Sequence, residues 1–286
     1  MRIIVVGANG YIARNLIKKL VIQHEVYSFV RNKPHSKLNE SQVYETKNLS
    51  EMRSNITRIH PELIINLAST YSPQHKYEEI KMLLDTEIGL SVNLAEICCE
   101  LGIYLMQTKS LFQNSTKGSG INLYAASKNG RDQLMQYFVA FKHLKLINLL
   151  LGDVYGCDDN RNKLIPAVIS HLRSENRSNF CLENPMRKFY PVFLEDVLAI
   201  VDILLSKIET KEIQSGEIQC FELEGMTLNE FVEEVQKIVS KSKFQVSWLI
   251  PNVDFRDAEL IIPEDLLNIR SEFTPLQLGF RHVLNI

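Results

Sequence analysis

The chain has 286 residues, a length that suits one large domain or two closely joined ones. Its composition, 45% hydrophobic and 23% charged, is that of an ordinary soluble globular protein, and its net charge of -2 gives no electrostatic support for nucleic acid binding. The five cysteines are scattered without CxxC spacing, which predicts reduced thiols in a cytoplasmic protein and excludes a disulfide framework or a zinc site. No apolar run is long enough for a signal peptide or a membrane span, so we expect no membrane partner.

The N-terminus predicts a dinucleotide-binding turn. Residues 3–6 form a continuous β-branched run, typical of a strand buried on both faces in a parallel sheet. The turn Gly7-Ala8-Asn9-Gly10-Tyr11-Ile12-Ala13 follows, and helical periodicity continues to Val21. Gly7 permits a tight turn, and Gly10 lets the backbone approach a pyrophosphate at the helix N-terminus. We therefore expect a cofactor site at Gly7, Asn9, Gly10, Tyr11 and Ile12; the alternative is a plain strand-to-helix turn.

The end of the second predicted strand, residues 24–30, indicates which dinucleotide is bound. A site specific for NAD normally has an acidic residue here to hold the ribose hydroxyls. This chain has Arg31, followed by Lys33, Ser36 and Lys37. A guanidinium at this place suits a 2′-phosphate, so we expect NADP(H) rather than NAD(H). The alternative is a solvated basic loop.

Further elements place polar residues at the same edge of the sheet. We predict a short helix over 51–58 capped by Ser50, a strand over 61–68, a helix over 81–100 and a strand over 104–107. Leu67, Ala68 and Ser69 would lie at one strand end and Thr108 at the next, where ligands lie in open α/β sheets. The apolar stripe of the helix over 81–100 predicts core or dimer surface and contains Leu84, Ile88, Val92, Ala95, Ile97 and Cys98.

Tyr124 and Lys128 are the candidate catalytic pair. A spacing of four residues on a helix puts both side chains on one face, one turn apart. The ammonium can stabilise a phenolate or hold a sugar hydroxyl, and a phenol with a lowered pKa can exchange a proton with an oxygen on carbon. Alone, this spacing is ordinary for two solvated or half-buried side chains.

Several motifs together give a family resemblance that covers nearly the whole chain. The motifs are Gly7-x-x-Gly10-x-x-Ala13, Asn66-Leu67-Ala68, Thr108, Tyr124-x-x-x-Lys128, Leu151-Gly152-Asp153-Val154-Tyr155-Gly156, the segment 189–197 and Pro275-Leu276-Gln277-Leu278-Gly279-Phe280. In this order and spacing they resemble the extended short-chain dehydrogenase/reductase (NAD-dependent epimerase/dehydratase) family. Each motif alone is weak.

The resemblance implies an α/β fold with a Rossmann-type doubly wound parallel sheet and a small, discontinuous C-terminal substrate-binding lid. The dinucleotide-binding domain would span residues 1–156 with a returning segment 189–222, and the lid would span 157–188 and 223–286. We also predict a helix over 197–205 capped by Asp196, a strand over 216–222, and a helix over 228–239 capped by Thr227. A homodimer through a four-helix bundle, formed by the helix over 81–100 and the helix starting near Tyr124, is implied as well.

The resemblance also implies roles for the candidate residues. Tyr124 would be the acid/base, Lys128 would lower its pKa and bind the nicotinamide ribose, and Thr108 would donate a hydrogen bond to the reacting oxygen. The run from Tyr155 to Pro166 resembles nucleotide-sugar 4-ketoreductases of the CDP-abequose/paratose synthase type, in which basic residues would hold the substrate diphosphate; Cys157 stands where the family usually has proline. The implied substrate-binding residues are Thr108, Lys109, Ser110, Asp153, Arg161, Lys163, Arg187 and Arg256.

Three reactions share this catalytic core. A 4,6-dehydratase of the family has an acidic pair after the strand-end threonine, and Lys109 and Ser110 replace it here. A 4-epimerase with retained NAD would have an acidic residue in place of Arg31. We therefore expect NADPH-dependent reduction of the 4-keto group of a CDP- or dTDP-linked 6-deoxy or 3,6-dideoxy hexose, in deoxysugar or O-antigen-type biosynthesis, without a metal. The alternatives are the 4-epimerase and a non-catalytic dinucleotide-binding sensor.

Overall fold

The computed structural model describes residues 1–32, 41–46, 48–72, 74–114, 120–174, 179–240, 243–249, 267–270 and 272–286. Within these ranges the main sheet has seven parallel strands in the order β11-β6-β5-β4-β1-β2-β3. They are β1 (Arg2–Val6), β2 (Glu25–Val30), β3 (Gln42–Glu45), β4 (Leu63–Asn66), β5 (Tyr104–Ser110), β6 (Lys145–Leu151) and β11 (Gly216–Cys220). The chain order reverses between β1 and β4, and ligands bind at the carboxyl ends of strands at such a point.

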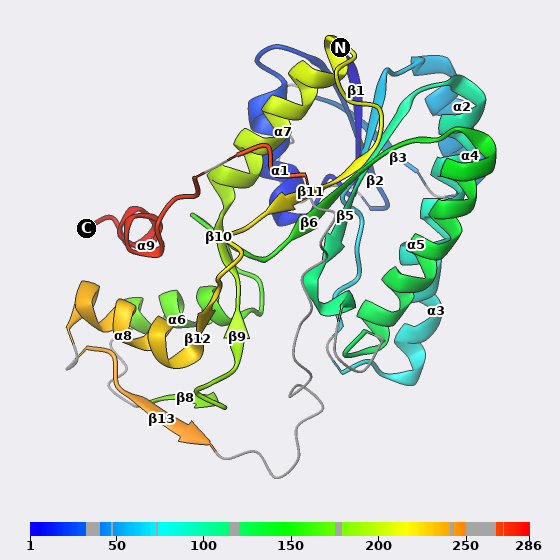
Figure 1. Cartoon of the computed structure of the whole chain (residues 1–286). Helices are drawn as coiled ribbons and strands as arrows, with labels where there is room; N and C mark the ends of the chain where they lie inside the picture. Colours follow the sequence, from blue (N-terminus) through cyan, green and yellow to red (C-terminus); the bar gives the residue numbers. More distant parts are fainter. Residues whose placement is uncertain are drawn as a thin grey trace.

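Helices cover both faces of the sheet (Figure 1). One face packs against α1 (Tyr11–Leu20) and α7 (Leu194–Glu209), and the other against α2 (Leu49–Ile59), α4 (Leu90–Leu101) and α5 (Leu123–Lys142). Side chains of a strand alternate between its two faces. Accordingly, Ile3 and Val5 of β1 join the core under α1 and α7, whereas Ile4 and Val6 join the opposite core. The predicted doubly wound α/β sheet is confirmed.

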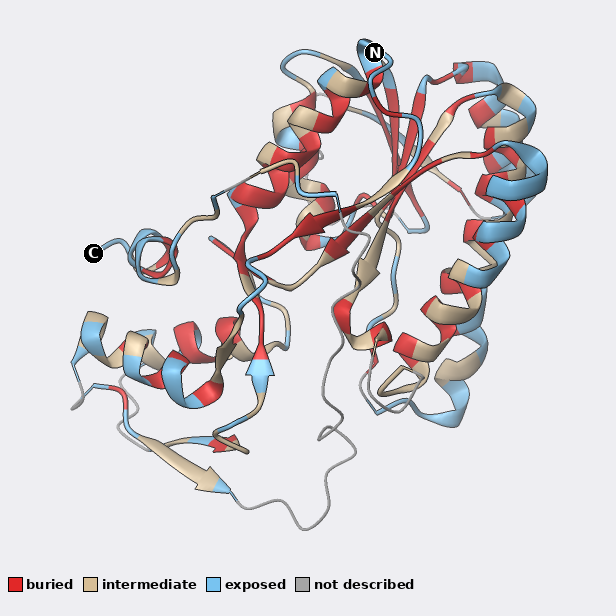
Figure 2. Cartoon of the chain, viewed as in Figure 1, coloured by how far each residue is buried: buried red, intermediate tan, exposed pale blue. Residues whose placement is uncertain are grey.

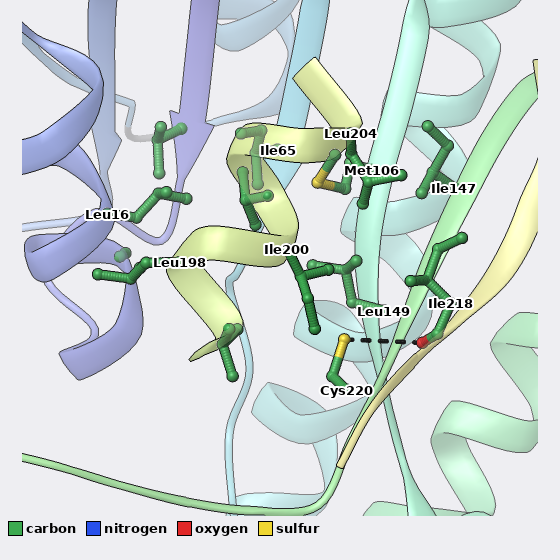
Figure 3. Packing of buried hydrophobic residues seen from close by; sticks show 14 of the residues in the cluster. Leu16, Ile65, Met106, Ile147, Leu149, Leu198, Ile200, Leu204, Ile218 and Cys220 are labelled. Carbon is green, nitrogen blue, oxygen red and sulfur yellow. Dashed lines mark hydrogen bonds between the residues drawn. The ribbon is translucent and has the colours of Figure 1, made fainter. Parts of the chain in front are cut away.

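The two cores bury nearly all of the central strands, which Figure 2 shows in red. Figure 3 shows one of them, in which Ile200 and Leu204 of α7 lie beside Met106 and Leu149 of the sheet. A spacing of four residues keeps Ile200 and Leu204 on one face of the helix. Both are fully buried, and burying such a side chain stabilises the fold by about 1.5–3 kcal/mol. This core fixes the strands whose ends carry the candidate site.

A third hydrophobic cluster forms a smaller lobe beside the carboxyl end of the sheet (Figure 1). Its aromatic centre includes Phe189, Phe231, Phe244 and Phe280, all buried. Thr227 caps α8 as predicted, because its side chain accepts from the Glu230 amide. The domain boundaries given above stay predictions. The elements around this lobe are β7 (Asp153–Tyr155), α6 (Leu164–Arg173), β8 (Phe180–Glu183), β9 (Lys188–Phe189), β10 (Pro191–Phe193), β12 (Met226–Thr227), α8 (Leu228–Val239), β13 (Val246–Leu249) and α9 (Leu276–Leu284).

The helix predicted over residues 81–100 is confirmed in its extent, but it is not a regular α-helix throughout and its predicted buried stripe is partly wrong. A 3₁₀ turn, η1 (Tyr77–Glu79), leads into the short helix α3 (Ile80–Leu84), which continues through a π-helical turn, η2 (Asp85–Gly89), into α4. The buried stripe also differs from the predicted one in its first half. Leu83, Glu87 and Ser91 are buried at intervals of four, while Leu84 is exposed. A carboxylate therefore occupies a position that apolar periodicity assigned to the helix surface.

Two predicted helix caps are wrong as well. Asn48 rather than Ser50 caps α2, since its side chain accepts from the Glu51 amide at 2.9 Å. Asp196 lies inside the first turn of α7, which begins at Leu194. Its buried carboxylate instead accepts from the amide and hydroxyl of Thr274, at 2.7 and 2.8 Å. Asp196 thus fastens the C-terminal segment to α7, and its predicted structural role holds through a different partner.

Among the described helices, none combines the length and the apolar character needed to cross a lipid bilayer.

Candidate active site

The turn between β1 and α1 is built for close backbone approach. Gly7 has φ +78°, in the left-handed region that favours glycine, and a Cβ there would lie 2.5 Å from the Ala68 amide nitrogen. The turn therefore packs directly on the strand-end residues Leu67 and Ala68, as the sequence predicted for a shared site. Helix α1 follows Gly10 with no side-chain cap and no acidic residue in its first turn. Its N-terminal amide groups suit an anion such as a pyrophosphate.

The end of β2 lies beside this turn. The Asn9 side-chain amide donates to the Asn32 carbonyl at 3.1 Å, which ties the turn to the residue after Arg31. Arg31 is exposed there, and the end of β2 carries no acidic residue to hold ribose hydroxyls. The described residues thus fit a dinucleotide with its adenosine end toward Arg31. Lys33, Ser36 and Lys37 lie outside the described residues.

Tyr124 and Lys128 both face inward from the start of α5. Asn122 caps this helix, because its side chain accepts from the Ala125 amide at 2.8 Å. The cap sets the helix start, so that Tyr124 is 8% and Lys128 only 1% exposed. The Lys128 ammonium lies 5.2 Å from the centre of the Tyr124 ring. The structure therefore brings the predicted pair together, with the lysine deeper in the protein.

A buried carboxylate that the sequence interpretation missed lies under this pair. The Glu87 carboxylate is fully buried, and its Oε2 lies 3.1 Å from the Lys128 Nζ. Its Oε1 accepts from the Ser69 hydroxyl at 2.6 Å and from the Thr70 amide at 3.0 Å. Glu87 belongs to the π-helical turn η2, a distortion frequent at functional sites. It thus connects the end of β4 to Lys128.

The electrostatics of the pair differ from the expectation. Burial, together with the negative charge of Glu87, raises the pKa of Tyr124, while a hydrogen bond with Ser69 and the Arg131 charge offset part of the rise. Burial and the Arg131 charge lower the pKa of Lys128 to about 8, against the opposing effect of Glu87. The lowered pKa that we expected for Tyr124 is not found in this structure, because burial, the largest effect, raises that pKa. Tyr124 is a phenol that keeps its proton at neutral pH.

The third predicted catalytic residue, Thr108, lies within β5 rather than after it. Its carbonyl accepts from the Lys128 ammonium at 3.4 Å and from the Arg131 guanidinium at 3.0 Å. Among the described residues its hydroxyl has no hydrogen-bond partner, so it is available to a ligand. Arg131 is another buried residue that the sequence interpretation missed, and Asp132 balances its charge at 2.8 Å.

Lys163 is a candidate substrate residue that the structure connects to this pair through Tyr71. Its ammonium lies 5.1 Å from the centre of the Tyr71 ring, and that ring packs edge-on against the Tyr124 ring at 5.3 Å. Burial lowers the pKa of Lys163, and the Asp153 carboxylate opposes this effect. No ion pair to a described residue engages its ammonium. Tyr71 thus links Lys163 to Tyr124.

Arg161 does not present the free guanidinium that we expected. Its donors bond both carboxylate oxygens of Asp159, at 2.8 and 2.6 Å, and the Val154 carbonyl at 2.7 Å. The guanidinium also lies 4.4 Å from the centre of the Tyr11 ring, and the Tyr11 hydroxyl donates to the Cys157 carbonyl at 2.9 Å. The expected diphosphate ligand therefore joins the loop over 157–163 to the dinucleotide turn.

The remaining substrate predictions have mixed outcomes. The Lys109 ammonium lies 2.6 Å from Glu217 and 3.4 Å from Asp132, so both carboxylates hold it away from a ligand. The Ser110 hydroxyl accepts from the Phe112 amide at 3.3 Å and starts the 3₁₀ turn η3 (Leu111–Gln113).

Three more predicted residues lie farther along the chain. The Asp153 carboxylate accepts from the Tyr190 amide at 3.2 Å, which leaves it partly engaged with the backbone. Arg187 is half-buried in the smaller lobe, before β9. Arg256 lies outside the described residues.

Two signals in the sequence could have pointed to the missed residues. Glu87 stands four residues after Leu83 and four before Ser91, so it interrupts a potentially buried helix stripe with a charge. Arg131 follows Tyr124 by seven residues, on the same helix face. Both patterns require the correct helix phase, and the π-helical turn η2 shifts that phase for Glu87.

Comparisons with known proteins agree with this fold. A model of the NAD dependent epimerase/dehydratase family matches residues 3–216. A CDP-abequose synthase from Yersinia pseudotuberculosis is 24% identical over 72% of this chain and 74% of its own, and a GDP-6-deoxy-D-talose 4-dehydrogenase from Aggregatibacter actinomycetemcomitans is 25% identical over 76% and 75%. The structure of TunA, an NAD dependent NDP-hexosamine 5,6-dehydratase, superposes with a TM-score of 0.79 at 17% identity and covers 99% of this chain and 96% of that one.

Proposed function

Because the chain belongs to the NAD dependent epimerase/dehydratase family, we propose that it is an NADPH-dependent 4-ketoreductase of a CDP- or dTDP-linked 6-deoxy or 3,6-dideoxy hexose. The observation that carries this proposal is the buried Tyr124 phenol, which keeps its proton beside Lys128 and the strand end that bears Thr108. A protonated phenol is the form that a carbonyl reductase needs. One relative is by name a CDP-abequose synthase, and another is a 4-dehydrogenase of GDP-6-deoxy-D-talose.

The cofactor would occupy the edge formed by the glycine turn and the end of β4. Gly7, Gly10 and the residues after β4 would accept the pyrophosphate and the nicotinamide half, and Arg31 would bind a 2′-phosphate. When bound, the reduced nicotinamide supplies the hydride. The family is NAD dependent, and we propose NADPH for this chain because Arg31 stands where NAD-specific sites have an acidic residue.

Side chains of the protein would stabilise the developing negative charge and supply the proton. Tyr124 would give its hydroxyl proton to the oxygen that becomes an alkoxide at the sugar C4 position, so that the Tyr124 O–H bond breaks as the sugar O–H bond forms. The Lys128 ammonium would steady the negative charge left on the phenolate, and the free Thr108 hydroxyl would donate to the reacting oxygen. In the structure this ammonium pairs with Glu87 at 3.1 Å, which keeps it in place.

The substrate would lie between this catalytic group and the smaller lobe. Lys163 is a cation without an anionic partner among the described residues, and Tyr71 connects it to Tyr124. Desolvation makes an unpaired ammonium a strong ligand for an anion, so Lys163 would contact the substrate's diphosphate or its sugar. Arg161 would act on the substrate only indirectly, because Asp159 already neutralises its guanidinium.

We also propose a homodimer through α5 and the helices before it. Leu134, Tyr137 and Phe141 lie three and four residues apart on α5 and are 43%, 50% and 74% exposed. Such a stripe of large apolar side chains is unusual on the surface of a monomer. Sedimentation of the wild type and of Phe141→Glu tests the proposal: we expect a dimer that the charge dissociates, and a monomeric wild type contradicts it.

The activity itself is tested with NADPH and a CDP- or dTDP-linked 4-keto-6-deoxyhexose, by the absorbance of the reduced nicotinamide. We expect consumption that depends on the sugar. A protein that instead interconverts two nucleotide sugars without net cofactor use would be an epimerase. Arg31→Asp tests the cofactor separately: binding of NADPH should weaken relative to NADH, and an unchanged preference would remove the argument from Arg31.

A further inference from the structure

The proposed reaction assigns no chemical step to the buried carboxylate of Glu87. It contacts three groups of the candidate site at once: the Lys128 ammonium at 3.1 Å, the Ser69 hydroxyl at 2.6 Å and the Thr70 amide at 3.0 Å. Burying a carboxylate costs a large desolvation free energy, which only well-placed partners offset. Its place on a π-helical turn suggests that the helix is distorted to aim it there.

The Lys128 ammonium makes this contact relevant to Tyr124. It lies 3.1 Å from the Glu87 Oε2 and 5.2 Å from the centre of the Tyr124 ring. The other carboxylate oxygen accepts the hydroxyl proton of Ser69, because a carboxylate has no proton to give. Glu87 therefore fixes the ammonium beside the Tyr124 ring and ties it to the end of β4.

We propose that Glu87 is a positioning residue that holds the Lys128 ammonium beside Tyr124 and, through its negative charge, keeps the Tyr124 phenol protonated. This inference rests on the proposed function, because it explains why the site favours proton donation and therefore carbonyl reduction. An enzyme that begins by oxidising an alcohol needs a phenolate at this position, and a carboxylate beneath it opposes that state. Glu87 thus favours the protonated phenol with which a carbonyl reduction begins.

The charges around Glu87 fix the sign of its effect. From α5 it faces Lys128, with Arg131 and Asp132 one turn farther along, and Lys163 approaches Lys128 from the start of α6. The negative charge of Glu87 favours the ammonium and disfavours the phenolate, so it raises the pKa of both groups. Glu87→Gln keeps the side-chain volume and removes the charge. It should therefore lower both pKa values and move the alkaline limit of proton donation to lower pH.

The first experiment measures kcat/KM against pH for reduction of a CDP-linked 4-keto-6-deoxyhexose by NADPH. In Glu87→Gln we expect the alkaline limb to shift down by about one pH unit, the size typical of a lost neighbouring charge. Asp85→Asn removes an exposed carboxylate from the same π-helical turn and should leave the profile unchanged. Ser69→Ala keeps the ion pair but removes one hydrogen bond that holds the Glu87 carboxylate, so kcat should fall about five- to tenfold, the loss of one hydrogen bond. Identical limbs in the wild type and Glu87→Gln would overturn the proposal.

The second experiment needs neither cofactor nor substrate. It measures the free energy of unfolding in urea against pH for the wild type and Glu87→Gln, each compared with its Lys128→Met counterpart. The folded pKa of Lys128, about 8, lies below its unfolded value of about 10.4, so between these values the unfolded chain binds more protons and stability rises with pH. In Glu87→Gln this rise should begin about one pH unit lower.

If the free energy of unfolding begins to rise at the same pH in the wild type and in Glu87→Gln, Glu87 and Lys128 are not coupled and the proposal is overturned. This outcome does not depend on which substrate the enzyme reduces. Conversely, a wild type that reduces neither sugar nucleotide would overturn the proposed function and leave the unfolding experiment to decide the role of Glu87.

Discussion

Replacing Lys128 by methionine leaves the Glu87 carboxylate buried without its counter-charge. The two side chains are 1% and 0% exposed, with Nζ and Oε2 at 3.1 Å. Removing one partner of such a pair costs about 3–5 kcal/mol of unfolding free energy. The Ser69 hydroxyl and the Thr70 amide still bond the other carboxylate oxygen, so we expect a value near the lower end, about 3 kcal/mol.

The double variant Lys128→Met/Glu87→Gln supplies the decisive comparison. It replaces an ion pair by a neutral pair of similar volume, a change that is often neutral in a protein interior. We expect its stability within about 1 kcal/mol of the wild type, measured by urea denaturation with circular dichroism at neutral pH. Lys142→Met, an exposed site on the same helix, should change stability by less than about 0.5 kcal/mol. The reasoning fails if Lys128→Met alone is nearly neutral, or if the double variant loses the sum of both single losses.

Two further predictions concern the frame of the site. Gly7→Ala forces a Cβ to 2.5 Å from the Ala68 nitrogen at a positive φ, so we expect about 2–5 kcal/mol of lost stability and no NADPH binding by fluorescence; a stable variant that binds NADPH contradicts the assigned turn. Asp196→Ala leaves the Arg270 guanidinium, now 2.7 Å from its carboxylate, and the Thr274 amide without their partner. We expect about 3 kcal/mol of lost stability in urea, and a loss under about 1 kcal/mol would rule out Asp196 as the anchor of the C-terminal segment.

The parts of the fold that the sequence predicted are those set by local chemistry. The β-branched run of β1 and the glycine turn depend on neighbouring residues, and so does the spacing of Tyr124 and Lys128 on one helix turn. The structure confirms the sheet and brings these residues to one edge. The seven motifs in order also indicated the family, because their order follows the chain path through the sheet.

The parts that the sequence did not predict depend on partners far along the chain. Asp196 resembles a helix cap locally, yet its partner Thr274 lies 78 residues away. Arg161 resembles a free phosphate ligand in the sequence, but the nearby Asp159 binds its guanidinium, and the fold adds the Tyr11 ring of α1. Glu87 lies in a π-helical turn, and its carboxylate accepts from Ser69 at the end of β4. The pKa of Tyr124 depends on burial and on the charges of Glu87 and Arg131, so its direction could not be derived from the sequence.

The central claim is that Tyr124 donates the proton in a reduction that consumes NADPH. The most direct test compares wild type and Tyr124→Phe for kcat with a CDP- or dTDP-linked 4-keto-6-deoxyhexose and for NADPH affinity by fluorescence. Loss of a general acid predicts a fall in kcat of about 10²- to 10⁴-fold, while NADPH affinity changes little because the phenyl ring still fills the site. A Tyr124→Phe variant that keeps wild-type turnover would contradict the claim.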